Sequence, residues 1–206
     1  MLRFLANFFS LVFNPLMAPT ALFYIILYHF PQIGGIGNDQ AKMKAIGFIF
    51  ATTFLFAFVL IYILYKLRMI SKITLDDQKD RYIPQLVLSI VYMLLAMFLG
   101  FRLGWGNGLT LTMVATTISA GVITGVNRFW KISTHASGVA GVYAICTALI
   151  LLYPGCPFRT PYICISFITI AVCASRLYLK AHTPMQIVCG FLVGGISGFA
   201  LFYFHG

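Results

Sequence analysis

Long runs of apolar residues alternate along this chain with short polar segments. The apolar runs cover roughly residues 8–30, 45–66, 84–101, 109–126, 137–153, 160–179 and 184–204. A helix needs about 20 apolar residues to cross the ~30 Å hydrocarbon layer of a bilayer, and the runs lack the strict alternation of transmembrane β-strands. The pattern predicts an all-α fold, a polytopic transmembrane helical bundle of six or seven helices that forms one domain over residues 1–206.

The first apolar run decides between six helices and seven. It contains Pro15 and Pro19 and has no clear small-residue cleavage site. We therefore interpret it as a retained span that is kinked at the prolines, not as a signal peptide that is removed. With this span included, seven helices are favoured.

Glycines at four-residue spacing mark two of the predicted helices. Gly190, Gly194 and Gly198 share one face of the last helix, and Gly121 and Gly125 share one face of the fourth. Small residues at this spacing let transmembrane helices approach each other closely. We expect both faces to be helix contacts.

The polar segments that follow the second, fourth and sixth runs contain most of the residues that could take part in catalysis or anion binding. They read KLRMISKITLDDQKDRYIP (66–84), NRFWKISTH (127–135) and SRLYLKAH (175–182). If every run spans the membrane, these three segments lie on the same side of it. The count of spans alone therefore predicts one polar face.

The composition agrees with a lipid environment. Hydrophobic residues make up 61% of the chain and charged residues only 9%, whereas soluble domains carry about 25% charged residues. The net charge is +10, and because the cations lie in short loops, anionic lipid head groups or a phosphate-bearing substrate are better partners for them than nucleic acid. Lys and Arg also gather on cytoplasmic loops whatever the function, an explanation that stays open for cations outside the histidine-bearing segments.

His182 is the first candidate for chemistry. It stands just before Pro184, where the last helix is expected to begin, and Gln186 in the first turn can orient its ring through a hydrogen bond. Arg176 ends the preceding helix, and its planar guanidinium suits two phosphate oxygens at once.

His135 is the second candidate. It follows Ser133 and Thr134 at the start of the fifth helix, where unpaired backbone amides attract an anion, and the small residues at 136–138 would let a substrate approach. Arg81 lies three residues before Pro84 in the first polar segment, after Lys72 and Lys79. Histidine serves as nucleophile or general acid near neutral pH, and arginine stabilises phosphoryl charge.

Three stretches resemble the three signatures of the type-2 phosphatidic acid phosphatase (lipid phosphate phosphatase) superfamily, in the same order. They are Arg81 with Pro84 for Lys-x6-Arg-Pro, Ser133-Thr134-His135-Ala136 for Pro-Ser-Gly-His-Ala, and Ser175-Arg176-x5-His182 for the third signature. The resemblance covers roughly residues 66–200. It departs from the family where Gln186 stands in place of an Asp four residues after the histidine, and Asp80 or another acid of the first polar segment could supply the missing carboxylate.

The resemblance implies a phosphohydrolase that needs no metal ion and no cofactor. His182 would attack phosphorus to form a phosphohistidine, and His135 would protonate the departing alkoxide. The remaining groups would bind the phosphoryl oxygens: Arg81, Arg176, Ser133, Thr134, and Lys72 or Lys79. The substrate would be a membrane lipid phosphate, of the phosphatidate, phosphatidylglycerophosphate or polyprenyl diphosphate class.

The resemblance also implies a multi-pass protein of a bacterial-type cytoplasmic membrane, with membrane lipids as partners and no nucleic acid. The side that carries the site stays open. The family mostly acts on the extracytoplasmic face, whereas the predicted polar face, with Arg3, carries ten of the fourteen Lys and Arg residues, which favours the cytoplasm. The identity of the lipid and the oligomeric state also stay open.

Other functions remain compatible with these residues. A lipid-binding or lipid-moving protein could retain the anion site without turnover, and Gln186 is the main support for that alternative. A phosphotransferase could use the same intermediate. A transporter fits less well, because the ionisable residues lie at the ends of the runs and not at mid-membrane depth.

Overall fold

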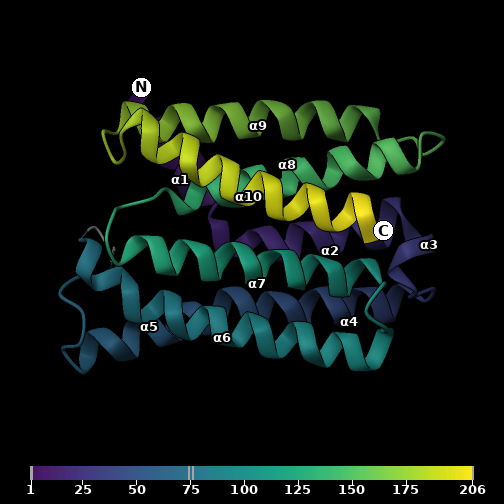
Figure 1. Cartoon of the computed structure of the whole chain (residues 1–206), viewed down its shortest axis with the longest axis horizontal. Coiled ribbons are helices and arrows are strands. Elements are labelled where there is room, and N and C mark those ends of the chain that lie inside the picture. Colours follow the sequence, from purple (N-terminus) through teal and green to yellow (C-terminus); the bar gives the residue numbers. More distant parts are fainter. Residues whose placement is uncertain (1, 74, 76, 206) are drawn as a thin grey trace.

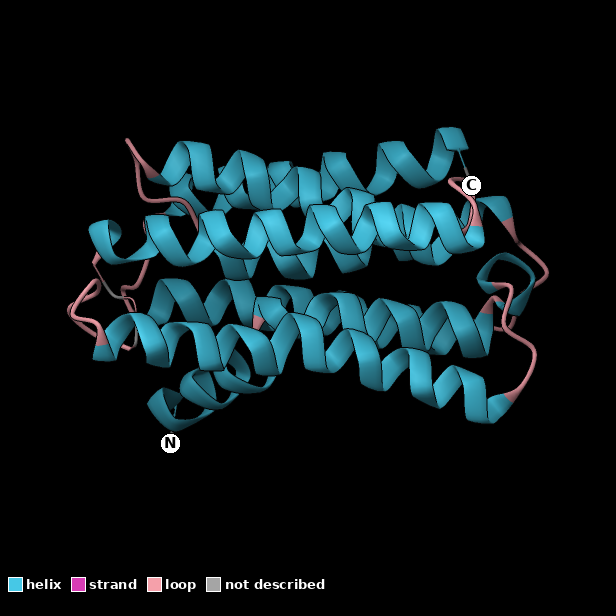
Figure 2. Ribbon diagram, turned by 90° about the horizontal axis from the view of Figure 1, so that it is seen from below, coloured by secondary structure: helices cyan, strands magenta, loops and turns pink. Residues whose placement is uncertain are grey.

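The computed structural model describes residues 2–73, 75 and 77–205. Their secondary structure consists of α1 (Leu2–Val12), the 3₁₀ turn η1 (Pro15–Met17), α2 (Ala18–His29), α3 (Pro31–Gly34), α4 (Asp39–Phe50), the π-helical turn η2 (Ala51–Leu55), α5 (Phe56–Lys66), α6 (Gln78–Leu103), α7 (Gly108–Asn127), α8 (Thr134–Leu152), α9 (Arg159–Tyr178) and α10 (Pro184–His205). The long helices run side by side along the long axis of the molecule (Figure 1). Within the described residues there is no strand (Figure 2).

Seven segments of the described chain are long and apolar enough to cross a membrane. They are Arg3–His29, Asp39–Lys66, Gln78–Leu103, Gly108–Asn127, Thr134–Leu152, Arg159–Tyr178 and Pro184–His205. The expected all-α bundle is confirmed, with seven spans. The chain is therefore a multi-pass integral membrane protein.

The third span begins earlier than its apolar run. Its helix α6 starts at Gln78, ahead of Pro84, which lies inside the helix. Arg81 therefore stands on α6 itself, one turn before the proline, and not in the preceding loop. A fixed helical position restricts where its side chain can reach.

The first span is bent at Pro15, as expected. The Asn14 side-chain oxygen accepts a hydrogen bond from the Leu16 backbone N–H at 3.0 Å, which caps the short turn η1 that Pro15 opens. Pro19 lies in the first turn of α2, where a helix tolerates proline. The bend turns α1 away from the axis of α2, as the oblique helix at the N-terminus in Figure 2 shows. The helix α1 packs against α9.

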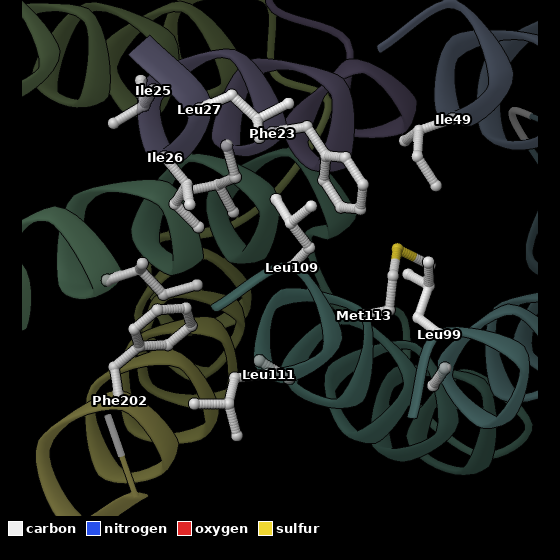
Figure 3. Packing of buried hydrophobic residues seen from close by; sticks show 14 of the residues in the cluster. Phe23, Ile25, Ile26, Leu27, Ile49, Leu99, Leu109, Leu111, Met113 and Phe202 are labelled. Atoms are coloured by element: carbon white, nitrogen blue, oxygen red, sulfur yellow. The ribbon is translucent and has the colours of Figure 1, made fainter. Parts of the chain in front are cut away.

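A large apolar core lies where α2, α6, α7, α8 and α10 meet. Its fully buried side chains include Phe23, Ile26, Leu109, Met113 and Phe202, which Figure 3 shows meeting in one cluster. Since lipid is as apolar as these side chains, dispersion contacts and close fit hold the helices together here. This core anchors the helices that position the polar end.

The glycine face of the last helix makes the expected close contact. A Cβ atom at Gly198 would lie 3.0 Å from the Gly141 carbonyl oxygen, and Cβ atoms at Gly190 and Gly194 would overlap the carbonyl groups of α8. The backbones of α8 and α10 therefore touch along their length. The prediction of close helix packing is confirmed for this face.

The glycines of the fourth helix behave differently. A Cβ atom at Gly121 or Gly125 would meet no atom within 4 Å. Both residues are exposed on the outer side of α7. The expectation that they form a helix contact is wrong, because equal spacing does not show which face of a helix meets its neighbour.

Candidate active site

The three polar segments lie at one end of the bundle, where α6, α8 and α10 begin and α5, α7 and α9 end, at the left in Figure 1. A cavity of about 740 Å³ lies among them. Its lining includes Arg81 from α6, Thr134 and His135 from α8, Arg176 from α9, and His182 ahead of α10. Both candidate histidines and both arginines thus face one space, of a size typical of ligand sites.

His182 has a defined tautomer. Its Nδ1 lies 3.2 Å from the Gln186 Oε1 atom, and the Thr183 backbone N–H donates to the same oxygen at 3.1 Å. A backbone N–H can only donate, so the shared atom must be the amide oxygen and not the amide nitrogen. His182 Nδ1 therefore carries the proton, and Nε2 keeps its lone pair.

Gln186 also ties the two histidine segments together. The Gln186 N–H donates back to the Thr183 hydroxyl at 3.4 Å, which completes a capping box at the start of α10. Its backbone carbonyl accepts the Ser133 N–H at 3.2 Å. The first turn of α10 thus fixes the ring of His182 and the start of the helix that carries His135.

The environment keeps His182 uncharged. The side chain is only 7% exposed, and burial, followed by the positive charges of Arg176 and Arg81, lowers its pKa from 6.5 to about 3. At neutral pH the ring is neutral. A neutral imidazole with a free Nε2 lone pair is a competent nucleophile.

Ser133 and His135 are held by different partners. Ser133 caps α8, because its hydroxyl accepts the Ala136 N–H at 3.3 Å, and it is buried outside the cavity lining. The Nε2 atom of His135 lies 3.1 Å from the carbonyl oxygen of Ser10 in α1. Since a carbonyl only accepts, His135 Nε2 carries a proton.

The two arginines reach the cavity from opposite helices. Arg81 is buried, and its Nε donates to the Leu75 carbonyl at 2.7 Å, which orients the guanidinium. The Nη1 atom of Arg176 donates to the Ser10 hydroxyl at 3.1 Å. Two oriented guanidinium groups on one cavity have the geometry and charge that suit a bound anion.

The first polar segment is folded by Asp80. Its carboxylate accepts the backbone N–H groups of Ser71 at 2.9 Å and Lys72 at 3.2 Å. The expectation that Asp80 could replace the missing partner of His182 is wrong, because its oxygens hold this loop. Lys72 and Lys79 are exposed and do not line the cavity.

Asn127 is a residue that the sequence reasoning missed. Its side chain donates to the Gln85 Oε1 atom at 2.9 Å and accepts the Ile132 N–H at 2.9 Å, while its carbonyl accepts from Gln78 at 2.8 Å. Asn127 thereby joins α6 to the segment before His135. The signal available in the sequence was an asparagine directly after the apolar run 109–126, and the structure shows that it is buried.

The helix α1 was missed as part of the site. Asn7, Ser10 and Asn14 all line the cavity. Asn7 and Ser10 are three residues apart on one side of α1, and Asn14 follows α1 as the cap of η1. Polar residues at positions 7, 10 and 14, in and just before the first apolar run, were a signal visible in the sequence. The space left by Gly138, where a substrate was expected to approach, faces Pro15 of η1, whose Cβ lies 3.0 Å from the position of an added Cβ.

The described residues contain no group of three His, Cys, Asp or Glu side chains that could hold a metal ion. The model of the PAP2 superfamily matches residues 109–206, a range that contains His135, Arg176 and His182 and leaves out Arg81. No curated protein and no solved structure matches the chain. The match covers slightly less than half of the chain and shows that residues 109–206 are similar to the PAP2 superfamily.

Proposed function

We propose that this protein is a lipid phosphate phosphatase that works through a phosphohistidine without a metal ion. The observation that carries the proposal is the arrangement of His182, whose Nε2 keeps a lone pair in a cavity lined by two guanidinium groups. The match of residues 109–206 to the PAP2 superfamily supports phosphatase activity in general. The phosphohistidine mechanism and the lipid phosphate substrate are what we propose beyond this general activity.

The first half-reaction forms the covalent intermediate. His182 Nε2 attacks phosphorus, the P–N bond forms, and the P–O bond to the lipid breaks. His135 in its protonated form gives a proton to the departing alkoxide, which leaves as an alcohol. Arg81 and Arg176 hold the phosphoryl oxygens, and the amides of the first turn of α8 at Thr134 face the same anion.

The second half-reaction restores the enzyme. A water molecule attacks the phosphohistidine, and His135 accepts its proton. Inorganic phosphate leaves, and His182 returns to its neutral form. Lys72 and Lys79 act from outside the cavity by raising the positive potential near it, and Ser133 acts as the cap that aims α8.

A lipid substrate fits the shape of the cavity. Apolar residues continue its lining into the bundle, among them Leu88, Tyr92 and Ile145. From His135 to Ile145 the cavity follows α8 for about 15 Å, at a rise of about 1.5 Å per residue. We infer a membrane lipid phosphate, of the phosphatidate, phosphatidylglycerophosphate or polyprenyl diphosphate class, in a bacterial-type cytoplasmic membrane.

Phosphate release from purified protein in detergent tests the proposal. With a chelator present, wild-type protein should release phosphate from at least one of these lipids, and His182→Ala should lose more than about 10³-fold in rate, because the substitution removes the proposed nucleophile. His29→Ala is the matched control, since His29 packs against Phe158 at the far end of the bundle. Equal release by wild type and His182→Ala would refute the role of His182.

The hydrogen-bond partner of His182 supports one alternative, a protein that binds lipid phosphates. Gln186 supplies an oxygen to His182 without the negative charge that would stabilise a charged ring, which favours a protein that binds lipid phosphates but turns them over slowly. Binding without release across the lipid panel, followed by a gain of release in Gln186→Asp, would identify this case. Transfer of phosphate to an added alcohol would identify a phosphotransferase.

A further inference from the structure

The helix α1 presents different chemistry on its two sides. Two of its aromatic side chains point outward, with Phe4 74% exposed and Phe8 48% exposed. In a membrane protein such a face contacts lipid. Asn7 and Ser10, by contrast, line the cavity that holds the two histidines.

Ser10 contacts two of the proposed reacting groups at once. Its backbone carbonyl lies 3.1 Å from His135 Nε2, and its hydroxyl accepts from Arg176 Nη1 at 3.1 Å. The carbonyl fixes the proton on His135 Nε2, so Nδ1 is the ring nitrogen that remains to exchange a proton with a substrate. The hydroxyl accepts from Arg176 and still has its own proton to donate.

The segment that carries Ser10 is fixed in place. Asn14 caps the turn that follows α1, Pro15 packs against α8 at Gly138, one turn beyond His135, and α1 itself lies on α9, which carries Arg176. Ser10 therefore holds a constant position relative to both groups that it contacts. Ser10 is therefore a fixed part of the lining of the site, and not a mobile residue that blocks it.

We propose that Ser10 is a positioning and substrate-contacting residue of this site: its carbonyl sets the tautomer of His135, and its hydroxyl orients Arg176 and donates to a phosphoryl oxygen. The inference rests on the proposed function of the cavity as a phosphate site. It makes α1 part of the active site, outside the part of the chain that matches the superfamily. The two histidines then hold opposite tautomers, with the proton on Nδ1 of His182 and on Nε2 of His135.

Two side-chain variants test the hydroxyl. Ser10→Ala keeps the backbone carbonyl and removes the hydroxyl, so the dissociation constant of inorganic phosphate and the KM for the lipid should each rise about tenfold, the usual cost of a hydrogen bond to a charged group. Ser10→Thr should restore most of both values. Ser166→Ala is the matched control and should match wild type, because the Ser166 hydroxyl donates to the Tyr162 carbonyl of its own helix at 2.9 Å and does not line the cavity.

The outcomes separate this inference from the proposed function. Unchanged or tighter phosphate binding in Ser10→Ala, measured by calorimetry, would overturn the role of the hydroxyl, and tighter binding would show that Ser10 obstructs the site. If wild type releases no phosphate from any lipid, the proposed function fails. Comparing phosphate binding by Ser10→Ala and Ser166→Ala still tests whether the Ser10 hydroxyl contacts the phosphate. Nitrogen-15 spectra of the histidine rings should show His135 as the Nε2–H tautomer, and an Nδ1–H tautomer would overturn the role of the carbonyl.

Discussion

At the scale of single residues, Gln186 and His182 form the unit on which the chemistry depends. The amide oxygen of Gln186 receives the ring N–H and the Thr183 N–H together. This fixes the tautomer of His182 without adding charge. The attacking nitrogen is therefore set by hydrogen-bond geometry, and its protonation by burial and the neighbouring arginines.

Gln186→Leu should reduce activity, by releasing the His182 ring, much more than it reduces the stability of the fold. The substitution removes the acceptor for the His182 ring, and a misplaced nucleophile costs roughly 10²-fold in kcat/KM. Loss of the cap should lower the free energy of unfolding by only about 1 kcal/mol. Parallel measurements of phosphate release and thermal unfolding, with the exposed Gln40→Leu as control, check this prediction. Full activity in Gln186→Leu would show that the ring is oriented in another way.

The charge state of His182 gives a prediction on pH. Because its pKa is lowered to about 3 in the folded protein, the ring should stay neutral as the pH falls from 7 to 4. Histidine in an unfolded chain has a pKa near 6.5. Between this pKa and the lower pKa of the folded protein, the unfolded chain binds more protons than the folded one. His182 therefore lowers the free energy of unfolding as the pH falls through this interval.

A ring titration by NMR measures this directly. His182 should show no protonation above about pH 4 in phosphate-free protein, while the exposed His205 provides an internal comparison. Protonation of His182 near pH 6.5 would contradict the account of its environment.

At the scale of helices, the contact between α8 and α10 sets the distance between the two histidine segments. A Cβ atom at Gly194 would overlap the Ser137 carbonyl, which belongs to backbone and cannot move aside. Overpacking of this kind costs about 1–3 kcal/mol. The packing of these two helices therefore links stability to the geometry of the site.

Gly194→Ala should lower both thermal stability and phosphate release, because α10 must shift away from α8. Gly121→Ala is the matched control: its Cβ would meet open space, and alanine favours a helix by up to about 1 kcal/mol over glycine. Melting temperature and kcat/KM in detergent, measured for both variants, check the prediction. Equal behaviour of the two variants would show that the contact does not position the site.

At the scale of the whole molecule, an even number of crossings separates each polar segment from the next, and this brings them to one end of the bundle. That arrangement could be predicted from the apolar runs, as could the seven spans and the bend at Pro15. The packing of α1 on α9 could not, because a proline shows where a helix bends and not in which direction. The partners of Asp80 and the empty face at Gly121 depend on contacts between distant segments, which spacing along the chain does not reveal.

The central claim is that Nε2 of His182 becomes bonded to phosphorus during turnover. The most direct measurement is rapid mixing of the protein with lipid phosphate, a quench in alkali, and mass spectrometry with phosphorus NMR on the phosphorylated peptide. We predict a phosphohistidine at residue 182, attached through Nε2, that is absent from His182→Ala. A phosphoryl group on another residue, attachment through Nδ1, or turnover with no phosphorylated intermediate would contradict it.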